Sequence, residues 1–389
     1  MPNDIALSSR RITSGPHHHF FGYIGHAGTI PWNASGRHIV ALRTTFQDRM
    51  PGPDDPADVI LLDTRDNYRV IPVEQSRAWN PQQGTMLYWN PQAAESQFFF
   101  NDRDPKTGKV FAVLYDIAQK QRVREYRFDD TPVGNSGVAQ KGGAFLAINY
   151  ARLDRLRKVT GYGGAWDWTV GVNAPENDGI FKIDVATGRK QLLVSFGQLR
   201  DVLRPEHADV DAKALFINHT LWNRDDDRIY FYCRGDFDTP RRLSVPFTIK
   251  PDGSGLTRQA HLGGHPEWDL GRRLIGGNGV LYDVDQRQAV GQIAGYPRGD
   301  PDVALSPDGK WLAIGDKVAG NPQENQYTVI RRSDGAQARL GGFSRGPWKG
   351  DLRVDGAPCW NRDGTQLLLT AIADDEQKTR QMFIISVKR

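Results

Sequence analysis

The stretch CWNRDGTQLLLTA at positions 359–371 decides the fold, because its pattern recurs along the whole chain. An aromatic or apolar residue comes first, a short turn rich in Asn, Asp or Gly follows, and an apolar, strand-like run completes the unit. The other copies surround Trp32, Trp89, Ile148, Trp222, Trp268 and Leu305. Together with Trp360, these anchors have a mean spacing of about 55 residues, close to one seventh of the 389-residue chain.

A second strand-like element follows each copy and ends in a turn rich in Asp, Asn or Gly. The clearest examples are VILLDTRDN at 59–67, VLYDVDQRQ at 280–288 and TVIRRSDGAQ at 328–337. Such turns connect antiparallel strands. Seven four-stranded units in series therefore predict an all-β fold, a seven-bladed β-propeller. Six or eight blades are the main alternatives.

The two ends of the sequence indicate how the ring closes. The last strand-like run, MFIISVKR at 382–389, comes too late in the chain to be followed by an outer strand. We therefore expect Ile5–Thr13 to pair with the last blade, which makes residues 1–389 a single β-propeller domain. The least strand-like segment is Arg152–Lys158, which fits one helical turn.

The composition excludes several classes of protein. Hydrophobic residues make up 39% and charged residues 25%, which is typical of a globular chain. The net charge of +4 is too small to indicate a surface that binds nucleic acid. No run approaches the roughly 18–20 apolar residues of a membrane helix. The N-terminal residues lack the apolar core of a secretory signal. Cys233 and Cys359 fall in apolar runs typical of buried, reduced thiols, so we expect a cytoplasmic protein.

Several cofactor and catalytic motifs are missing from the sequence. There is no Walker loop, no GxGxxG between a strand and a helix, no HExxH and no GxSxG. We therefore expect no nucleotide cofactor and no serine-hydrolase chemistry.

The repeat also predicts which side chains face the centre of the ring. The residue three positions before each anchor lies near the entrance of an innermost strand, where propellers usually bind ligands. These positions hold Thr29, Met86, Phe145, His219, His265, Asp302 and Ala357. His219, His265 and Asp302 stand on consecutive blades, which favours a functional site. A histidine there can serve as a general base or bind a metal ion, whereas a lone histidine is more often structural.

Further candidates favour an anionic, carbohydrate-like ligand. Four arginines follow or end strands expected to line the centre, and a guanidinium can bind a carboxylate through two hydrogen bonds. They are Arg43, Arg103, Arg152 and Arg234. Tyr150 and Tyr23 supply phenols that can donate a proton. Trp79, Gln82 and Gln83 suit a sugar face and its hydroxyl groups. The alternative is that the tryptophan belongs to the core and the amides bind turn backbones.

A second histidine cluster is found in HHHFFGYIGH at 17–26. Adjacent side chains point in different directions, so at most one or two of His17, His18 and His19 can share a metal site with His26. The charge run RDDDR at 224–228 is expected to be the turn of its hairpin.

Several segments resemble the oligogalacturonate lyase family and its TolB-like propeller relatives. They are AWNPQQGTMLYW at 78–89, FFFNDRD at 98–104, NHTLW at 218–222, GHPEW at 264–268, SPDGKWLAIGD at 306–316 and APCWNRDGTQLLL at 357–369. The resemblance covers nearly the whole chain. It implies a seven-bladed intracellular enzyme that cleaves short uronate oligosaccharides by β-elimination.

The resemblance also implies roles for single residues. In that family a His acts as or beside the base, an Arg neutralises the uronate, and a manganese ion is held by His and Gln. His219 matches the catalytic His, and His265 is the candidate ligand of a divalent metal, manganese or calcium. The chain departs from the family at Ala357, where a His is expected and only Asp351 and Asp355 stand nearby.

Related propeller lyases that act on ulvan or rhamnose–glucuronate linkages use His, Tyr and Arg without such a metal. Tyr150 and Arg234 fit that pattern. We therefore predict a lyase for a small acidic oligosaccharide. His219 would remove the C5 proton, Arg234 would neutralise the uronate carboxylate, and Tyr150 or a second His would protonate the departing C4 oxygen.

Two other functions remain open at this point. One is a propeller that binds carbohydrate or a protein partner without catalysis, since a fold does not imply a function. The other is a glycoside hydrolase acting on uronate glycosides, which would need a pair of inward carboxylates. The sequence predicts neither the exact sugar and linkage nor the oligomeric state.

Overall fold

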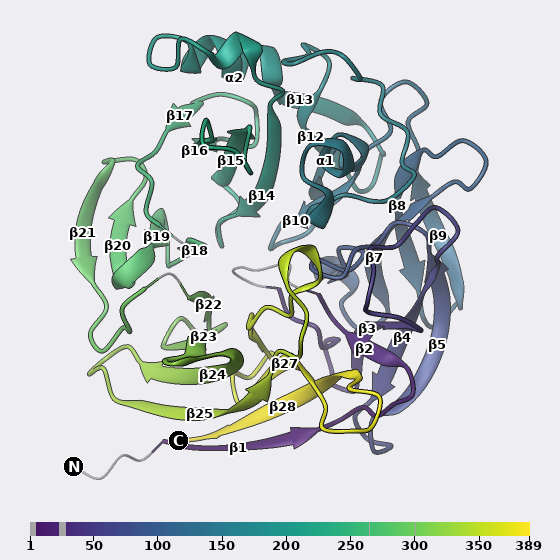
Figure 1. Ribbon diagram of the computed structural model, residues 1–389, viewed down its shortest axis with the longest axis vertical. Coiled ribbons are helices and arrows are strands. Elements are labelled where there is room, and N and C mark those ends of the chain that lie inside the picture. The colour runs from purple at the N-terminus through teal and green to yellow at the C-terminus, as the bar shows by residue number, and fades with distance from the viewer. Residues whose placement is uncertain (1–4, 23–28, 264, 300) are drawn as a thin grey trace.

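The computed structural model describes residues 5–22, 29–263, 265–299 and 301–389. In this part of the chain, seven four-stranded antiparallel sheets stand around a central axis as the blades of a propeller (Figure 1). The predicted all-β, seven-bladed fold is confirmed, and the alternatives of six or eight blades are wrong.

From the innermost strand outward, the first blade consists of β2 (His18–Phe20), β3 (His38–Thr44), β4 (Ala57–Asp63) and β5 (Arg69–Ser76), and the second of β6 (Tyr88–Trp89), β7 (Gln97–Arg103), β8 (Val110–Asp116) and β9 (Gln121–Tyr126). The third consists of β10 (Gly134–Val138), β11 (Ala144–Ile148), β12 (Gly179–Asp184) and β13 (Lys190–Ser195), and the fourth of β14 (Phe216–Trp222), β15 (Ile229–Gly235), β16 (Leu243–Ile249) and β17 (Thr257–Arg258). The fifth blade consists of β18 (Glu267–Trp268), β19 (Arg273–Ile275), β20 (Val280–Asp283) and β21 (Gln288–Gln292), and the sixth of β22 (Asp302–Leu305), β23 (Trp311–Val318), β24 (Asn321–Arg331) and β25 (Gln337–Ser344). The seventh consists of β26 (Cys359–Trp360), β27 (Gln366–Ile372), β28 (Arg380–Lys388) and β1 (Ala6–Arg11).

Tryptophan marks the repeat because its indole joins neighbouring blades. Four tryptophans end the innermost strands of their blades, and each indole Nε1 donates a hydrogen bond to a backbone carbonyl of the preceding blade. The pairs are Trp89 with Pro31, Trp222 with Gly137, Trp268 with Leu221 and Trp360 with Ala304, at 2.6–3.1 Å. A buried indole N–H needs such an acceptor, so the residue type and its spacing follow from the stacking of the blades.

In the third blade the predicted anchor, Ile148, is wrong. It ends the second strand, β11, whereas the innermost strand is β10, with Gly137 as its indole acceptor. A Cβ on this glycine would lie 2.7 Å from the carbonyl oxygen of Thr220 in the next blade, so the close approach requires glycine. Phe145 therefore does not face the centre but packs against Tyr126, with ring centroids 5.0 Å apart.

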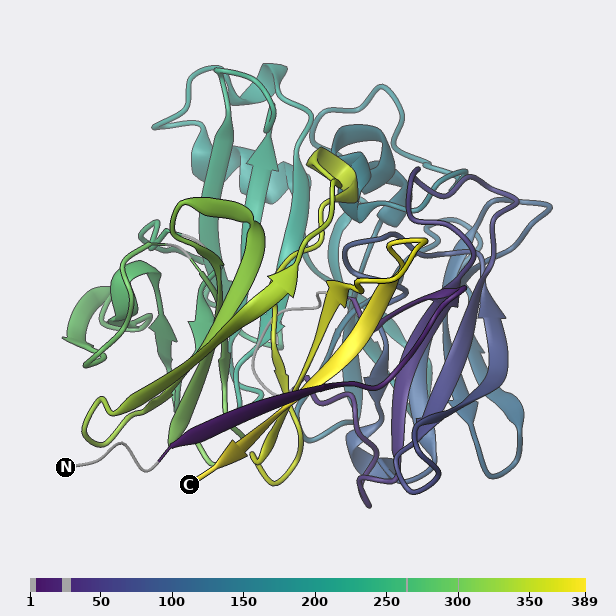
Figure 2. The ribbon, with the colours of Figure 1, turned by 60° about the horizontal axis from the view of Figure 1, so that its bottom comes forward.

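The ring closes in the last blade, as predicted. Strand β1 pairs with β28 in antiparallel register, from Ala6 opposite Lys388 to Arg11 opposite Phe383. The two strands run side by side in both views of the molecule (Figures 1 and 2). Because segments from both ends share one sheet, the pairing supports a single domain over residues 1–389, which stays a prediction.

The helices are few and short. Helix α1 (Tyr150–Leu156) is capped by Asn149, whose side chain accepts hydrogen bonds from the second and third residues of the helix, and it confirms the predicted helical turn. Helix α2 (Phe196–Leu203) was not predicted, because eight residues are too few to establish a helical period; Ser195 and Gln198 form a capping box at its start. The 3₁₀ turns are Pro91–Ala93, Lys158–Thr160, Val210–Ala212, Gly277–Gly279 and Gly350–Leu352. None of the described helices is long and apolar enough to cross a membrane.

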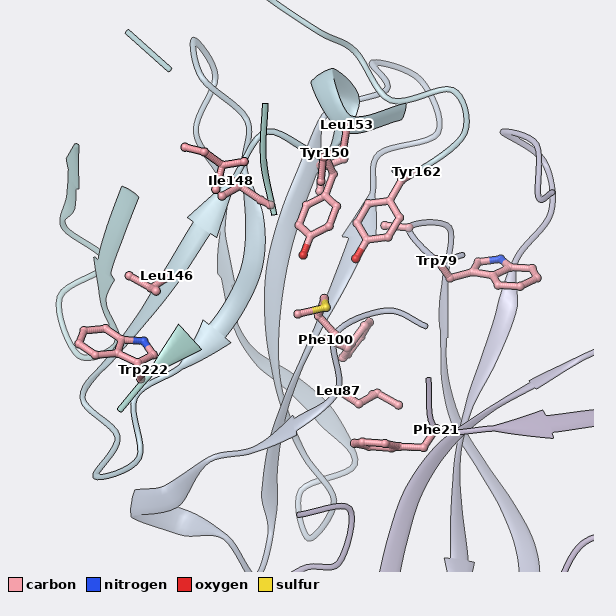
Figure 3. Close-up of a cluster of buried hydrophobic side chains, with 14 of the residues drawn as sticks. Phe21, Trp79, Leu87, Phe100, Leu146, Ile148, Tyr150, Leu153, Tyr162 and Trp222 are labelled. Atoms are coloured by element: carbon pink, nitrogen blue, oxygen red, sulfur yellow. The ribbon is translucent and has the colours of Figure 1, made fainter. Parts of the chain in front are cut away.

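The core lies between the faces of neighbouring blades. One cluster of buried side chains joins Phe21, Trp79, Leu87 and Phe100 to residues of the third and fourth blades (Figure 3). Cys233 and Cys359 are buried and unbonded to one another, as predicted.

Candidate functional site

A cavity of about 460 Å³ lies at the mouth of the ring where the innermost strands begin and the second strands end. Its volume is in the range of small-ligand sites. Five of the predicted site residues line it: Gln82, Gln83, His219, Arg234 and His265. These side chains come from the fourth blade, the start of the fifth and the segment before β6, so only the closed ring brings them together.

A second cavity, of about 290 Å³, lies where the innermost strands end. Its two arginines, Arg224 and Arg362, are already engaged by the fold. Arg224 donates to the carbonyl oxygens of Leu305, Ser306 and Pro307, and Arg362 Nε donates to those of Trp32 and Asn33. Because these guanidinium groups bind backbone, the first cavity is the better candidate for a charged ligand.

Two histidines line the first cavity, and an aspartate outside its lining contacts one of them. The rings of His219 and His265 have centroids 5.1 Å apart. Asp302 Oδ1 lies 3.1 Å from Nδ1 of His265, and its side chain is only 14% exposed. The carboxylate can therefore orient the imidazole. These three residues belong to consecutive blades, the fourth, fifth and sixth, as predicted.

The backbone at His219 has an unusual conformation, with φ of 56°. The register of β14 against β15 shifts between Asn218 and Leu221, so His219 sits in a bulge. Met86, which holds the same repeat position in the second blade, also has φ of 56°. The same backbone conformation therefore occurs at this repeat position in the second and fourth blades, and in the fourth blade it presents an imidazole to the cavity.

The loop before β6 presents two amides. Asn80 Oδ1 accepts hydrogen bonds from the backbone N–H groups of Gln82 and Gln83, at 3.1 and 2.7 Å, which fixes the loop. The side-chain amide of Gln82 donates to Asp355. Asn218 adds a carboxamide oxygen that is buried without a hydrogen-bond partner among the described residues and so can accept from a ligand hydroxyl.

The lining is strongly basic. Four arginines and three histidines face one acidic residue, Asp355. Sequence reasoning did not single out four of these basic residues: Arg157, Arg242, Arg353 and His261. They lie on connections between strands, outside the repeated unit, so the spacing that located His219 carries no signal for them. Such a lining favours an anionic ligand.

Asp355 occupies the part of the last blade where the resemblance implies metal ligands. Burial, together with the negative charge of Asp302, raises the pKa of its carboxyl group. Arg353 Nε lies 3.0 Å from Asp355 Oδ1. The turn Gly350–Leu352 lies against the turn Lys158–Thr160, and this contact brings the last blade close to the third. Of the two nearby replacements for the missing His, Asp355 lines the cavity and Asp351 does not.

Tyr150 lies outside the cavity, contrary to its predicted role as proton donor. It is 1% exposed, and its hydroxyl donates to the carbonyl oxygen of Asn135 at 3.0 Å. Its ring stacks on Tyr162 with centroids 4.2 Å apart, and the two phenols lie together in the core (Figure 3). The misplaced anchor in the third blade explains the error, because Tyr150 follows the second strand of that blade.

Arg152 is a structural residue, although we predicted that it binds substrate. Its guanidinium donates to the carbonyl oxygens of Leu215, Val172 and Asn173 at 2.5–3.1 Å, and to Thr169 Oγ1 at 2.8 Å. These bonds join the third blade to the fourth and leave the group buried.

Three further substrate-binding predictions also fall outside the cavity lining. Trp79 belongs to the core, where it packs on Phe46 and donates from Nε1 to the carbonyl oxygen of Asp55 at 2.7 Å. Arg43 pairs with Asp58 across the first blade at 2.8 Å. Arg103 is buried and donates to the carbonyl oxygen of Pro53.

No metal site built from His, Cys, Asp or Glu alone is found among the described residues. They contain no group of three or more His, Cys, Asp or Glu side chains placed to hold a metal ion. His18 Nδ1 accepts from the backbone N–H of Arg380, and burial lowers the pKa of His19 to about 4, so both are engaged in the core. The predictions for His26 and Tyr23 fall outside the described residues.

No protein-family model matches the chain, and no curated protein matches it. Solved structures do match. An oligogalacturonate lyase in complex with manganese has a TM-score of 0.65 and 14% identity, over 98% of this chain and 96% of that chain. An oligogalacturonate lyase from Vibrio parahaemolyticus has a TM-score of 0.62 and 12% identity, over 99% of this chain and 98% of that chain. The protein shares the fold of oligogalacturonate lyases.

The resemblance predicted from the sequence is thus confirmed at the level of the fold. The β-propeller domain of Cps50 (Swd1) from Myceliophteria thermophila also matches, with a TM-score of 0.50 and 15% identity over 93% of this chain and 96% of that chain. Identity to the two lyases is no higher than to this third structure, so the likeness shows the fold alone.

Proposed function

We propose that the protein is a lyase that cleaves a uronic-acid-containing oligosaccharide by β-elimination. The observation that carries the proposal is the pair His219 and His265, 5.1 Å apart, in a cavity lined by four arginines. An imidazole pair supplies a base and an acid near neutral pH, and the arginines suit a carboxylate. The shared fold of solved oligogalacturonate lyases supports the same chemistry.

The first step needs a base and a way to stabilise negative charge. His219 takes the proton from C5 of the uronate, and the electron pair of the broken C–H bond moves toward the adjacent carboxylate. Arg234, 6% exposed, lies in the cavity wall and stabilises the charge that develops on that carboxylate. A buried guanidinium does this well because its fork matches the carboxylate and little water screens it.

The second step breaks the bond between C4 and the glycosidic oxygen. The electrons form a C4–C5 double bond, and the departing oxygen needs a proton. We assign this proton to His265, whose Nδ1 lies 3.1 Å from Asp302 Oδ1, so that the carboxylate orients the ring. His265 takes the place of Tyr150, since the phenol of Tyr150 is buried away from the cavity.

A divalent metal would add a Lewis acid beside the uronate carboxylate, as suggested by the manganese complex of the similar lyase. The ligands would have to include His265, but the described residues offer no set of three His, Cys, Asp or Glu side chains. We therefore assign no step to a metal ion, and the positive charge of the arginines carries the stabilisation of the carboxylate.

We also infer a cytoplasmic location. The support is that Cys233 and Cys359 are buried and unpaired, which suits a reducing compartment.

The test is to incubate the protein with a panel of uronate oligosaccharides and follow the ultraviolet absorbance of new unsaturated ends. Product formation that is lost in His219→Ala supports the proposal. Saturated products would indicate hydrolysis, and binding without turnover would indicate a carbohydrate-binding module. Hydrolysis has weaker support, because the described lining presents one carboxylate, Asp355, where a pair is needed.

A further inference from the structure

Three arginines gather around one aromatic ring in the wall of the cavity. The guanidinium carbons of Arg242, Arg157 and Arg234 lie 3.8, 4.0 and 4.5 Å from the centroid of Phe237. They come from separate segments: Arg157 follows α1, Arg234 is in β15, and Arg242 precedes β16. Cation–π attraction to the half-buried ring holds the three groups near one another despite their like charge.

The positive charge of this cluster is poorly balanced by the protein. Arg157 Nη1 pairs with Asp238 at 3.1 Å, and Asp238 is 73% exposed. Arg234 Nε donates to the neutral Ser244 Oγ at 3.2 Å. Among the described residues, neither Arg234 nor Arg242 forms an ion pair with a carboxylate, which leaves excess positive charge beside the cavity.

The environment of Arg234 reflects that excess. Burial, followed by the positive charges of Arg157 and Arg242, lowers the pKa of its guanidinium to about 10. An anion that reached the cluster would relieve this repulsion. By contrast Arg353, the fourth arginine of the lining, already has Asp355 as a partner at 3.0 Å.

The cluster extends the site away from the histidines. Tyr232 separates the two regions: its ring centroid is 6.1 Å from that of His219 and 4.4 Å from the guanidinium carbon of Arg234. Arg234 therefore lies over both Tyr232 and Phe237, between the histidine pair and the other two arginines. If Arg234 serves the uronate that reacts at His219, then Arg157 and Arg242 remain for another group.

We propose that Arg157, Arg242 and Phe237 form a second oxyanion-binding subsite, which holds an acidic group on the sugar unit next to the one that reacts. The substrate class is thus an oligosaccharide with acidic groups on adjoining units, either carboxylates or sulfate esters. The position of the subsite relative to the reacting unit rests on the proposed function, whereas oxyanion binding by the cluster does not. The planar forks of two arginines can bind either kind of oxyanion through paired hydrogen bonds.

The first experiment tests the subsite alone, by calorimetric titration of inorganic sulfate at constant ionic strength. The variant is Arg242→Gln, because Arg242 is exposed and its loss spares the core. The matched control is Arg241→Gln, which removes the same charge from the neighbouring residue outside the cavity lining. We expect the wild type and Arg241→Gln to bind sulfate and Arg242→Gln to bind it about tenfold more weakly. No sulfate binding by the wild type, or equal binding by Arg242→Gln, would overturn the subsite.

The second experiment compares substrates with one and with two acidic groups. The probes are a uronate disaccharide, the same disaccharide with its non-reacting carboxylate methyl-esterified, and a form that carries a sulfate ester in place of that carboxylate. We expect esterification to raise KM about tenfold with little change in kcat, and Arg242→Gln to abolish that difference. The sulfated probe shows which oxyanion is preferred.

The outcomes separate the two proposals. Cleavage with equal KM for the free and the esterified disaccharide keeps the lyase function and overturns the second subsite. Sulfate binding that depends on Arg242, without unsaturated product from any probe, keeps the subsite and overturns the lyase function.

Discussion

The imidazole rings of His219 and His265 lie 5.1 Å apart, although they belong to different blades. One sits in the bulge of β14 and the other just before β18. The innermost strands converge on the axis, so side chains near the beginnings of neighbouring strands meet there. This relationship places a candidate base beside a candidate acid.

Replacement of His219 by Ala is expected to lower kcat for elimination by about 10²- to 10⁴-fold, the usual contribution of a general base. The measurement is the initial rate of unsaturated product. His207→Ala, which removes a histidine outside the cavity lining, is the control and should retain the rate. Full activity in His219→Ala would show that another group takes the proton.

Tyr150→Phe is expected to affect stability and not chemistry. The change removes the hydroxyl that donates to the carbonyl of Asn135, at a cost of about 1 kcal/mol in the free energy of unfolding. Urea unfolding measures the cost, and the rate of elimination should stay within about twofold of wild type. A large fall in kcat with unchanged KM and stability would return the role of proton donor to Tyr150.

Asp178 is expected to make stability depend on pH. It is fully buried, and burial raises the pKa of its carboxyl group to about 7, against about 3.9 in an unfolded chain. From about pH 4 to pH 7 the folded protein keeps a proton that the unfolded chain has lost, so the free energy of unfolding falls as pH rises through this window and levels off above it.

Asp178→Asn should reduce this pH dependence. The fall in the free energy of unfolding that Asp178 causes between about pH 4 and pH 7 is at most on the order of 4 kcal/mol. Urea unfolding at several pH values measures it. Asp184→Asn is the control. Hydrogen bonds with Thr187 lower the pKa of Asp184, so its carboxyl group is ionised in the folded and in the unfolded chain above about pH 5. Replacing Asp184 should therefore leave the dependence of the free energy of unfolding on pH unchanged above about pH 5. An unchanged slope in Asp178→Asn would show that its carboxyl group titrates normally.

Chelation tests the metal prediction. The described residues offer no group of three His, Cys, Asp or Glu side chains placed to hold a metal ion, so we expect dialysis against EDTA to leave the rate of elimination unchanged within about twofold. The rate before and after chelation, and again after Mn²⁺ is added back, is the measurement. A loss that Mn²⁺ restores would show that a metal takes part in the reaction.

The fold could be predicted because its repeat has a physical cause. An indole at the end of each of four innermost strands binds the carbonyl of the preceding blade, so tryptophans recur at the spacing of the blades. The innermost strand of the third blade was not predicted, because its sequence is GNSGV and the next blade packs closely against Gly137. Because this strand consists of small and polar residues that let the next blade come close, it lacks the apolar pattern that marks the other copies.

The site was predictable only as far as the repeat extends. His219, His265 and Asp302 hold equivalent positions, so the spacing of the anchors located them. Arg157 and Arg242 lie on connections whose lengths differ between blades. Arg242 shares its connection with Phe237, and Arg157 reaches that ring from the neighbouring third blade. Arg152 shows the converse, because the sequence reveals a charged side chain but not that backbone carbonyls already surround it.

The pairing of β1 with β28 has a consequence for how the protein assembles. On the ribosome β1 emerges before the other described strands and β28 after them, so β1 waits until the rest of the ring has been made before it can pair. Closing so long a loop costs little more entropy than closing a shorter one, but contacts distant in sequence form slowly. Completion of the last sheet is therefore expected to be the final step of folding. Until that step, the exposed edge of β28 can recruit the corresponding strand of another molecule.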